Sequence, residues 1–202
     1  MINRKDTTKL LTDILLQDRL RDRKYYAKEV TLDYGTIHSK RVDVIQFIPK
    51  GVTYSSDMEK GIFICYEIKS CKDDVYSGNG LNFFGEKNYI VTTMETYKML
   101  QEDLREGRLG NYIKNHYPDS SQYYGILVPV PSYIDMRDSN AVYKEYENPT
   151  KFEGLPHDWK LWSAVHCNEG PRKKPITELL FCMLRSKHNY TNQEKIQEDW
   201  NE

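Results

Sequence analysis

Two apolar stretches of the sequence carry charged residues at positions where a buried strand normally has none. Asp43 stands within the run 41–47, and Glu67 and Lys69 stand near the end of the run 61–70. Both runs are rich in β-branched and aromatic residues and are bounded by turn formers, which predicts buried strands. Because Asp, Glu and Lys are rarely buried without a partner, we interpret these three residues as a candidate functional cluster.

The chemistry that such a cluster suits is metal-assisted hydrolysis of a phosphate ester. Side chains alternate along a strand, so Glu67 and Lys69 are expected on one face. A hairpin of the two strands brings Asp43 beside Glu67, and two carboxylates that close repel each other unless a cation lies between them. Mg²⁺ (or Mn²⁺) is the expected cofactor, because it binds carboxylate oxygens and activates both water and phosphate. Lys69 then orients the water or neutralises charge on the phosphate.

At these residues the chain resembles the PD-(D/E)xK nuclease superfamily, whose signature is an acid on one strand and acid-x-Lys on the next. Asp43 and the run Glu67-Ile68-Lys69 carry the resemblance, with Val42 where the family often has Pro. The surrounding sequence, including the run 82–89, is more similar to the MmcB-like branch of bacterial DNA-repair and phage proteins. The repair proteins of that branch tend to have a Lys-Trp pair here, which this chain lacks.

The resemblance implies an α/β fold: a restriction-endonuclease-like αβββαβ core with a mixed central sheet flanked by helices. It implies a metal-dependent nuclease that hydrolyses phosphodiester bonds in nucleic acid, with DNA expected, in repair, recombination or phage DNA processing. The implied metal ligands are Asp43, Glu67 and the backbone carbonyl of Ile68, with Lys69 as the catalytic cation. Glu29 matches the position of an auxiliary acid, and an ordinary surface glutamate is the alternative reading of it.

Two other interpretations of the charged cluster stay open. The superfamily also contains nuclease-like domains that bind nucleic acid or a protein partner without cleaving, and a fold does not fix an activity. A purely structural salt bridge among Asp43, Glu67 and Lys69 is the third interpretation, ranked last because buried ion pairs seldom stabilise a fold. The intact set of charges favours the enzyme, since a non-catalytic descendant has no reason to keep a costly cluster in a strand pair.

Hydrophobic periodicity predicts the elements that position the cluster. A polar loop over 49–60 joins the two motif strands. The other expected strands cover 28–34, 89–92, 123–130 and 159–166. The expected helices cover 6–23, Met94 to Gly107 and 176–184, and a short helix or loop covers 70–89. Pro129 is expected to place the end of its strand at an edge of the sheet.

The chain is expected to form one nuclease-like domain over 1–188, with a core over about 6–130, an elaboration over 131–188 and a polar tail over 189–202. In 131–170, aromatic and basic residues alternate, which suits either a cap on the sheet edge or a grip on nucleic acid. Cations beside the start of the last helix offer a seat for phosphate. The residues expected to bind nucleic acid are Arg41, Lys72, Asn82, Lys87, Arg172 and Lys173.

Composition and charge exclude several classes of protein. With 202 residues, a net charge of −1 and 39% hydrophobic residues, the chain is typical of a soluble globular protein and not of one that coats DNA non-specifically. Any contact with nucleic acid is therefore local, and a protein partner is one source of further affinity. The four cysteines form no Cys-x-x-Cys pair and show no zinc spacing with histidine, so a reducing cytoplasm is expected. No apolar run reaches the length of a membrane span.

Overall fold

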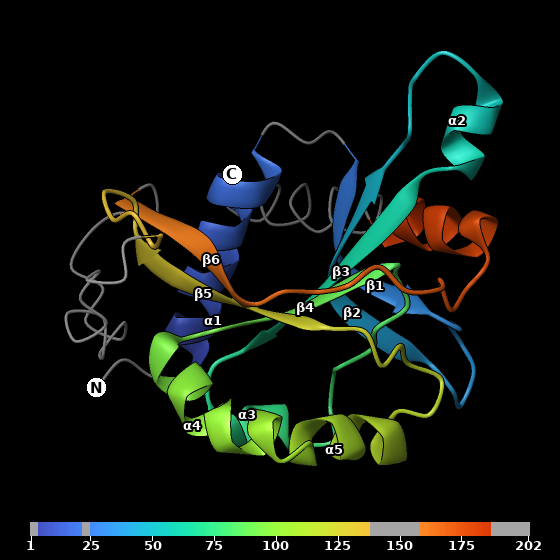
Figure 1. Cartoon of the computed structure of the whole chain (residues 1–202). Helices are drawn as coiled ribbons and strands as arrows, with labels where there is room; N and C mark the ends of the chain where they lie inside the picture. The colour runs from blue at the N-terminus through green and yellow to red at the C-terminus, as the bar shows by residue number, and fades with distance from the viewer. Residues whose placement is uncertain (1–3, 22–24, 138–157, 187–202) are drawn as a thin grey trace, which may run out of the picture.

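The computed structural model describes residues 4–21, 25–137 and 158–186 of the chain. These residues form a six-stranded mixed sheet with helices on both faces (Figure 1). The strands lie across the sheet in their sequence order, β1 to β6. Neighbours β1–β2, β2–β3 and β5–β6 are antiparallel, and β3–β4 and β4–β5 are parallel. The predicted α/β class, with a mixed central sheet flanked by helices, is confirmed.

The elements begin with one helix and three strands, as the predicted order requires. Their bounds are α1 (Arg4–Leu15), the π-helical turn η1 (Leu16–Leu20), β1 (Tyr26–Leu32), β2 (Lys40–Ile48), α2 (Ser55–Glu59), β3 (Ile62–Lys69), α3 (Lys72–Val75), β4 (Lys87–Thr92), α4 (Met94–Arg105), α5 (Arg108–His116), β5 (Gly125–Pro131) and β6 (Trp159–Val165). A last helix is described over 176–186.

The central strand β3 sends alternate side chains into two different hydrophobic clusters. Ile64 and Tyr66 face α1 and η1 on one side of the sheet. Phe63 and Cys65 belong to the cluster on the other side, against which the helix over 176–186 packs. Because helices cover both faces, β3 reads in the sequence as a nearly continuous apolar run, which is typical of a central strand.

The face of the sheet opposite α1 is covered by two groups of helices (Figure 1). Helices α3, α4 and α5 pack on β4 and β5, and the helix over 176–186 packs on β1, β2 and β3. The segment 76–86 connects the two groups, because Leu81 and Phe83 belong to the first cluster and Phe84 belongs to the second. Glu67 and Lys69 alternate with the residues of β3 that face α1, so they lie on this face, beneath the connecting segment.

Three features of the fold differ from the expectations. The loop over 49–60 contains the short helix α2, and helix α5 follows α4 directly after Gly107, whose φ of +72° ends α4 but allows a second helix to start. The prediction that Pro129 marks a sheet edge was wrong, because Pro129 pairs with Leu161 of β6. Proline is accommodated there because the register of β5 with β4 already ends at Leu127.

Several expectations concern residues outside the described ranges. The polar tail 189–202 and the central part of the 131–170 segment, residues 138–157, lie there. Within the described residues no helix combines the length and the apolar character that crossing a membrane requires. All four cysteines are free, and Cys65 and Cys182 lie in the core, as their apolar surroundings in the sequence predicted.

Candidate active site

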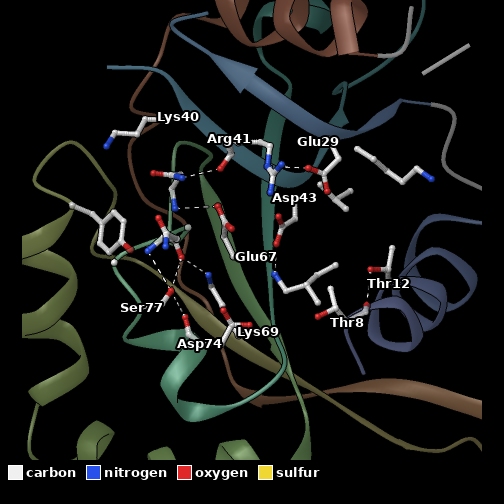
Figure 2. Close-up of a pocket in the computed structure, with 18 of the residues that line it drawn as sticks. Thr8, Thr12, Glu29, Lys40, Arg41, Asp43, Glu67, Lys69, Asp74 and Ser77 are labelled. Carbon is white, nitrogen blue, oxygen red and sulfur yellow. Dashed lines mark hydrogen bonds and ion pairs between the residues drawn. The ribbon is translucent and has the colours of Figure 1, made fainter. Parts of the chain in front are cut away.

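Strands β2 and β3 separate at the end of the sheet where the predicted cluster lies. Their last paired residues are Val44 and Tyr66, and one further step of the antiparallel register places Asp43 opposite Glu67. The Asp43 carboxylate enters the opening, where its Oδ2 accepts a hydrogen bond of 2.7 Å from the Ile68 N–H. Figure 2 shows the Asp43 and Glu67 side chains next to each other at this point. A side chain thus takes the place of a backbone ladder bond and joins the ends of the two strands.

Glu67 is a buried carboxylate, with 1% of the residue exposed. Its Oε1 accepts a hydrogen bond of 3.0 Å from the Asn82 N–H. The Asn82 side chain in turn donates to the Arg41 carbonyl oxygen of β2 at 2.8 Å (Figure 2). The segment 76–86 is therefore fastened to both motif strands through one residue, and it covers the Glu67 carboxylate.

Lys69 lies two residues further along β3 and is also buried, with 5% exposed. Its Nζ donates a hydrogen bond to the Asn79 carbonyl oxygen, and its own carbonyl oxygen accepts from Thr92 Oγ1 at 2.6 Å. Gly80 has a φ of +80°, and a Cβ there would lie 2.5 Å from Lys69 Nζ and 2.9 Å from Glu67 Oε2. The backbone of the segment consequently lies directly on the two charged groups, in a conformation that favours glycine.

Burial raises the pKa of both carboxyl groups in the opening. The pKa of Glu67 lies well above its usual range, first because of burial and then because of the nearby Asp43 charge, against the opposing effects of Lys69 and the Asn82 N–H. The pKa of Asp43 is also raised by burial, in spite of the Ile68 N–H, Lys69 and Arg41, which lower it. The Asp43 charge thus disfavours ionisation of Glu67, and Asp74 does the same for Asp43. A bound cation relieves repulsion of this kind.

A polar cavity of about 790 Å³ opens beside these groups. This volume is within the range of ligand sites in proteins. The walls come from α1, β1, β2, β3 and the segment after β3, and Thr8 and Thr12 on α1 face the cluster from the opposite wall (Figure 2). Besides Asp43, Glu67, Ile68 and Lys69, the lining residues include Arg4, Thr8, Thr12, Lys28, Glu29, Lys40, Arg41, Asp74, Ser77, Asn79, Asn82 and Tyr117.

The donor atoms of the opening suit a hard cation that keeps much of its water. No group of three or more His, Cys, Asp or Glu side chains that could hold a metal ion occurs among the described residues. Asp43 Oδ1 and Glu67 Oε2 are the second oxygens of two carboxylates whose first oxygens accept backbone N–H groups. The carbonyl of Ile68 points to the same side of β3 as its N–H, which faces Asp43. Two carboxylates and a carbonyl are oxygen ligands of the kind that Mg²⁺ and Mn²⁺ take.

Glu29 lies opposite Asp43 on the neighbouring strand β1. The pairs Lys28–Val44 and Val30–Val42 flank it in the register, and its own φ of +52° interrupts the ladder. Its carboxylate forms an ion pair of 2.9 Å with Arg41 Nε, and its side chain is 54% exposed. Burial, more than the repulsion from Asp43, raises the pKa of Glu29, and Arg41 lowers it. Glu29 therefore lies on the cavity wall with a cation attached to it.

Three of the residues expected to bind nucleic acid lie around this cavity or beside it. Arg41 and Asn82 line it, and Lys173 lines a second cavity of about 760 Å³. The two cavities share Lys40, Asn82 and Tyr117 as lining residues, so they meet at that point. The backbone N–H of Lys173 also donates to the Phe84 carbonyl oxygen at 3.0 Å, which places the start of the last helix beside the segment 76–86.

The other three lie away from the cluster. Lys72 Nζ forms an ion pair of 2.7 Å with buried Asp103, which joins α3 to α4. Lys87 is the first residue of β4, and Arg172 lies over the Phe63 ring near the start of β3. That end of β3 is separated from Lys69 by the length of an eight-residue strand, about 25 Å. Lys87 and Arg172 thus lie toward the start of β3, away from Lys69, whereas Lys72 lies close to Lys69 in the chain but is paired with Asp103.

Sequence reasoning missed the contribution of α1. Arg4, Thr8 and Thr12 are spaced four residues apart, which places them on one face of a helix, and all three line the cavity. Arg4 also forms an ion pair with Asp74, which ties α1 to the residues after β3. The polar stripe beside the apolar stripe of α1 was the signal that could have found them. Tyr117 follows α5 and offered no comparable local pattern.

In comparisons with known proteins, no protein-family model, no curated protein and no solved structure matches this chain.

Proposed function

We propose that this chain is a metal-dependent nuclease that hydrolyses phosphodiester bonds in nucleic acid, with DNA as the expected substrate. The observation that carries the proposal is the meeting of Asp43, Glu67 and Lys69 where β2 and β3 separate, on the wall of a polar cavity. Burying charged groups costs free energy that a protein seldom recovers in stability, and strongly perturbed carboxyl groups in a cleft are typical of functional sites. The resemblance to the PD-(D/E)xK superfamily supports the same assignment.

In this proposal Asp43, Glu67 and the Ile68 carbonyl hold the ion. Mg²⁺ or Mn²⁺ supplies Lewis acidity, which polarises the phosphate and lowers the pKa of a water molecule. Lys69 exchanges its hydrogen bond to the Asn79 carbonyl for one to the phosphate or to the attacking water, and so stabilises the negative charge that develops. Glu29 holds Arg41 at the cavity wall through their ion pair, where the guanidinium contacts the phosphate backbone.

A second candidate function is binding of nucleic acid or of a protein partner without cleavage. One observation favours it: Lys69 Nζ already donates a hydrogen bond to the Asn79 carbonyl oxygen, and Glu67 Oε1 accepts one from the Asn82 N–H. The segment 76–86 therefore covers both charged groups. An enzyme must move this segment when substrate binds, whereas a binding protein has no such requirement. The nuclease remains the better-supported function, because a binding protein gains nothing from two carboxylates placed where they oppose each other.

The cellular setting proposed for this activity is the cytoplasm. The four free cysteines suit a reducing compartment, where such thiols persist. A net charge of −1 suits a short contact with nucleic acid, with a protein partner as a further source of affinity and specificity. Repair, recombination and phage DNA processing are the settings in which a nuclease of this kind acts.

The test is cleavage of labelled single-stranded, duplex, flapped and junction DNA, with Mg²⁺, with Mn²⁺ and with chelator. The wild type is compared with Asp43→Ala and Lys69→Ala, and with Lys87→Ala as a matched control at the far end of the sheet. Cleavage that requires metal, disappears in the first two variants and persists in the third supports the nuclease. Equal cleavage by all four proteins would assign the activity to another site or to a contaminant. Binding without cleavage, unchanged in all variants, would favour the second function.

A further inference from the structure

Tyr117 lines both cavities and carries a buried hydroxyl. The residue is 6% exposed, and its ring packs in the core cluster beneath β4 and β5. Within the described part of the chain its hydroxyl oxygen has no hydrogen-bond partner. Buried polar groups are nearly always paired, so this hydroxyl requires a physical explanation.

Neighbouring tyrosines show what a satisfied hydroxyl looks like in this fold. The Tyr112 hydroxyl, near Tyr117 in space, accepts a hydrogen bond of 2.9 Å from the Gly78 N–H. On the other face of the sheet the Tyr66 hydroxyl donates to Gln46 Oε1 at 3.0 Å. The segment 76–86 is thus held to α5 by the hydrogen bond that Gly78 donates to Tyr112, next to Tyr117.

The surroundings of Tyr117 favour a negatively charged acceptor. After burial, the nearby Tyr112 hydroxyl and then the Glu67 charge raise its pKa, but the Tyr112 hydroxyl does not meet the geometry of a hydrogen bond to it. The protonated phenol is thus left as a hydrogen-bond donor. Among the described residues neither Lys40 nor Lys173 has an acidic partner, and both are exposed. Lys40 lines both cavities, as Tyr117 does, and Lys173 lines the second.

The acids that line the second cavity do not cancel these cations. Asp33, on the wall of the second cavity, is paired with Lys174 at 2.8 Å. Asp119 is the other acid that lines this cavity, against the cations Lys40, Lys173 and Lys174. The wall of the second cavity thus carries an excess of positive charge, which suits a polyanion that extends beyond the first cavity.

We propose that a nucleic-acid strand bound at Asp43, Glu67 and Lys69 continues from the first cavity into the second, and that the Tyr117 hydroxyl donates a hydrogen bond to a phosphate oxygen of this strand. This inference rests on the proposed function and adds the path of the substrate. The hydroxyl is enclosed in the free protein, so the strand reaches it when the stretch around Gly78 shifts. Tyr117 is then a substrate-binding residue whose missing partner is supplied by the substrate.

The test compares Tyr117→Phe with Tyr66→Phe, because each variant removes one buried hydroxyl and keeps the ring. Binding of fluorescein-labelled single-stranded DNA is measured by anisotropy in Ca²⁺, and thermal unfolding is measured without DNA. Tyr117→Phe is expected to weaken binding about tenfold, the effect of one lost hydrogen bond to a charged group, with an unchanged or raised Tm. Tyr66→Phe is expected to lower the Tm, because Gln46 loses its partner, with binding unchanged.

A second measurement identifies the acceptor. Methylphosphonate replaces one phosphate of the DNA at a time, and the position that reduces wild-type binding while leaving Tyr117→Phe unaffected is the linkage that the hydroxyl contacts. If Tyr117→Phe binds DNA as tightly as the wild type does, the inference is overturned and the nuclease proposal is left intact. A Tm for Tyr117→Phe as low as that of Tyr66→Phe would also overturn it, because the hydroxyl would then have a partner in the free protein. If the wild type binds none of the DNAs, the proposed function and the strand path both fail.

Discussion

Asp43 and Glu67 lie opposite each other at the first register step beyond the last paired residues of β2 and β3. Each carboxylate accepts a hydrogen bond from a backbone N–H, Asp43 from Ile68 and Glu67 from Asn82. The charge of Asp43 adds to the effect of burial in raising the pKa of Glu67. The end of the sheet is therefore less stable than an apolar strand end would be.

Replacing Glu67 by Gln is expected to make the free protein more stable at neutral and alkaline pH. Because the pKa of Glu67 is raised in the folded state, the folded protein holds this proton more tightly than the unfolded chain does. The stability linked to the protonated carboxyl is present below about pH 4.3 and is lost as pH rises through the folded pKa. The gain of Glu67→Gln over the wild type should therefore be absent at pH 4 and grow toward pH 8. Urea unfolding across this range measures it.

The same variant is expected to lose DNA cleavage, because the amide keeps the hydrogen bond from Asn82 but removes the charge that holds a cation. Glu59→Gln, on exposed α2, is the control and should leave both the pH profile and the activity unchanged. A loss of stability in Glu67→Gln at pH 8 would contradict the like-charge explanation and indicate that the carboxylate is needed by the fold itself.

Mg²⁺ and Mn²⁺ are expected to raise the Tm of the wild type. A ligand that binds only the folded state stabilises it by about 2.7 kcal/mol at a concentration 100 times its Kd, which for a domain of this size shifts the Tm by about 5–10 °C. Asp43→Asn and Glu67→Gln should show little of this shift, because each loses one carboxylate ligand. Differential scanning fluorimetry with chloride salts of both metals measures it, and K⁺ at matched ionic strength is the control. Equal shifts in all three proteins would place the cation elsewhere.

Gly80→Ala is expected to impair activity more than Gly78→Ala does. Both glycines have a positive φ, +80° and +77°, so alanine introduces similar backbone strain at each, about 1–2 kcal/mol. A Cβ at Gly80 also meets Lys69 Nζ and Glu67 Oε2, whereas nothing lies within 4 Å of a Cβ at Gly78. Displacing those two groups should lower the cleavage rate about 100-fold in Gly80→Ala alone. Chemical denaturation and single-turnover cleavage separate strain from displacement, and equal rates for the two variants would argue against a tightly packed cluster.

Lys40→Ala is expected to weaken DNA binding, and Lys87→Ala is not. Lys40 lines both cavities, whereas Lys87 begins β4 at the other end of the sheet and lies 3.9 Å from Glu169. Loss of one phosphate contact should reduce the slope of log Kd against log salt by about 1. Fluorescence anisotropy from low to moderate salt measures both quantities. A reduced slope in Lys87→Ala would show that the DNA extends to the far end of β3 and β4.

The strands that carry the motif were predictable because their signals are local. The run of β-branched and aromatic residues identified β3, and the two-residue alternation of a strand placed Glu67 and Lys69 on one face before any contact was known. The order of helix and strands followed from periodicity in the same way. Helix α5 was not predicted, because Gly107 ends α4 and the next helix starts at the following residue. In the sequence the two helices look like one helix followed by a polar loop.

What surrounds the cluster was decided by contacts between residues far apart in the chain. The sequence determined which residues share a strand face, because neighbouring residues and backbone geometry set that property. It did not determine that the backbone at Gly80 lies on Lys69, that Thr8 and Thr12 of α1 face Asp43, or that Lys87 and Lys173 lie in different places. Those relations depend on how helices and loops pack on the sheet, and packing is set by the summed burial of many side chains, which no short stretch of sequence encodes.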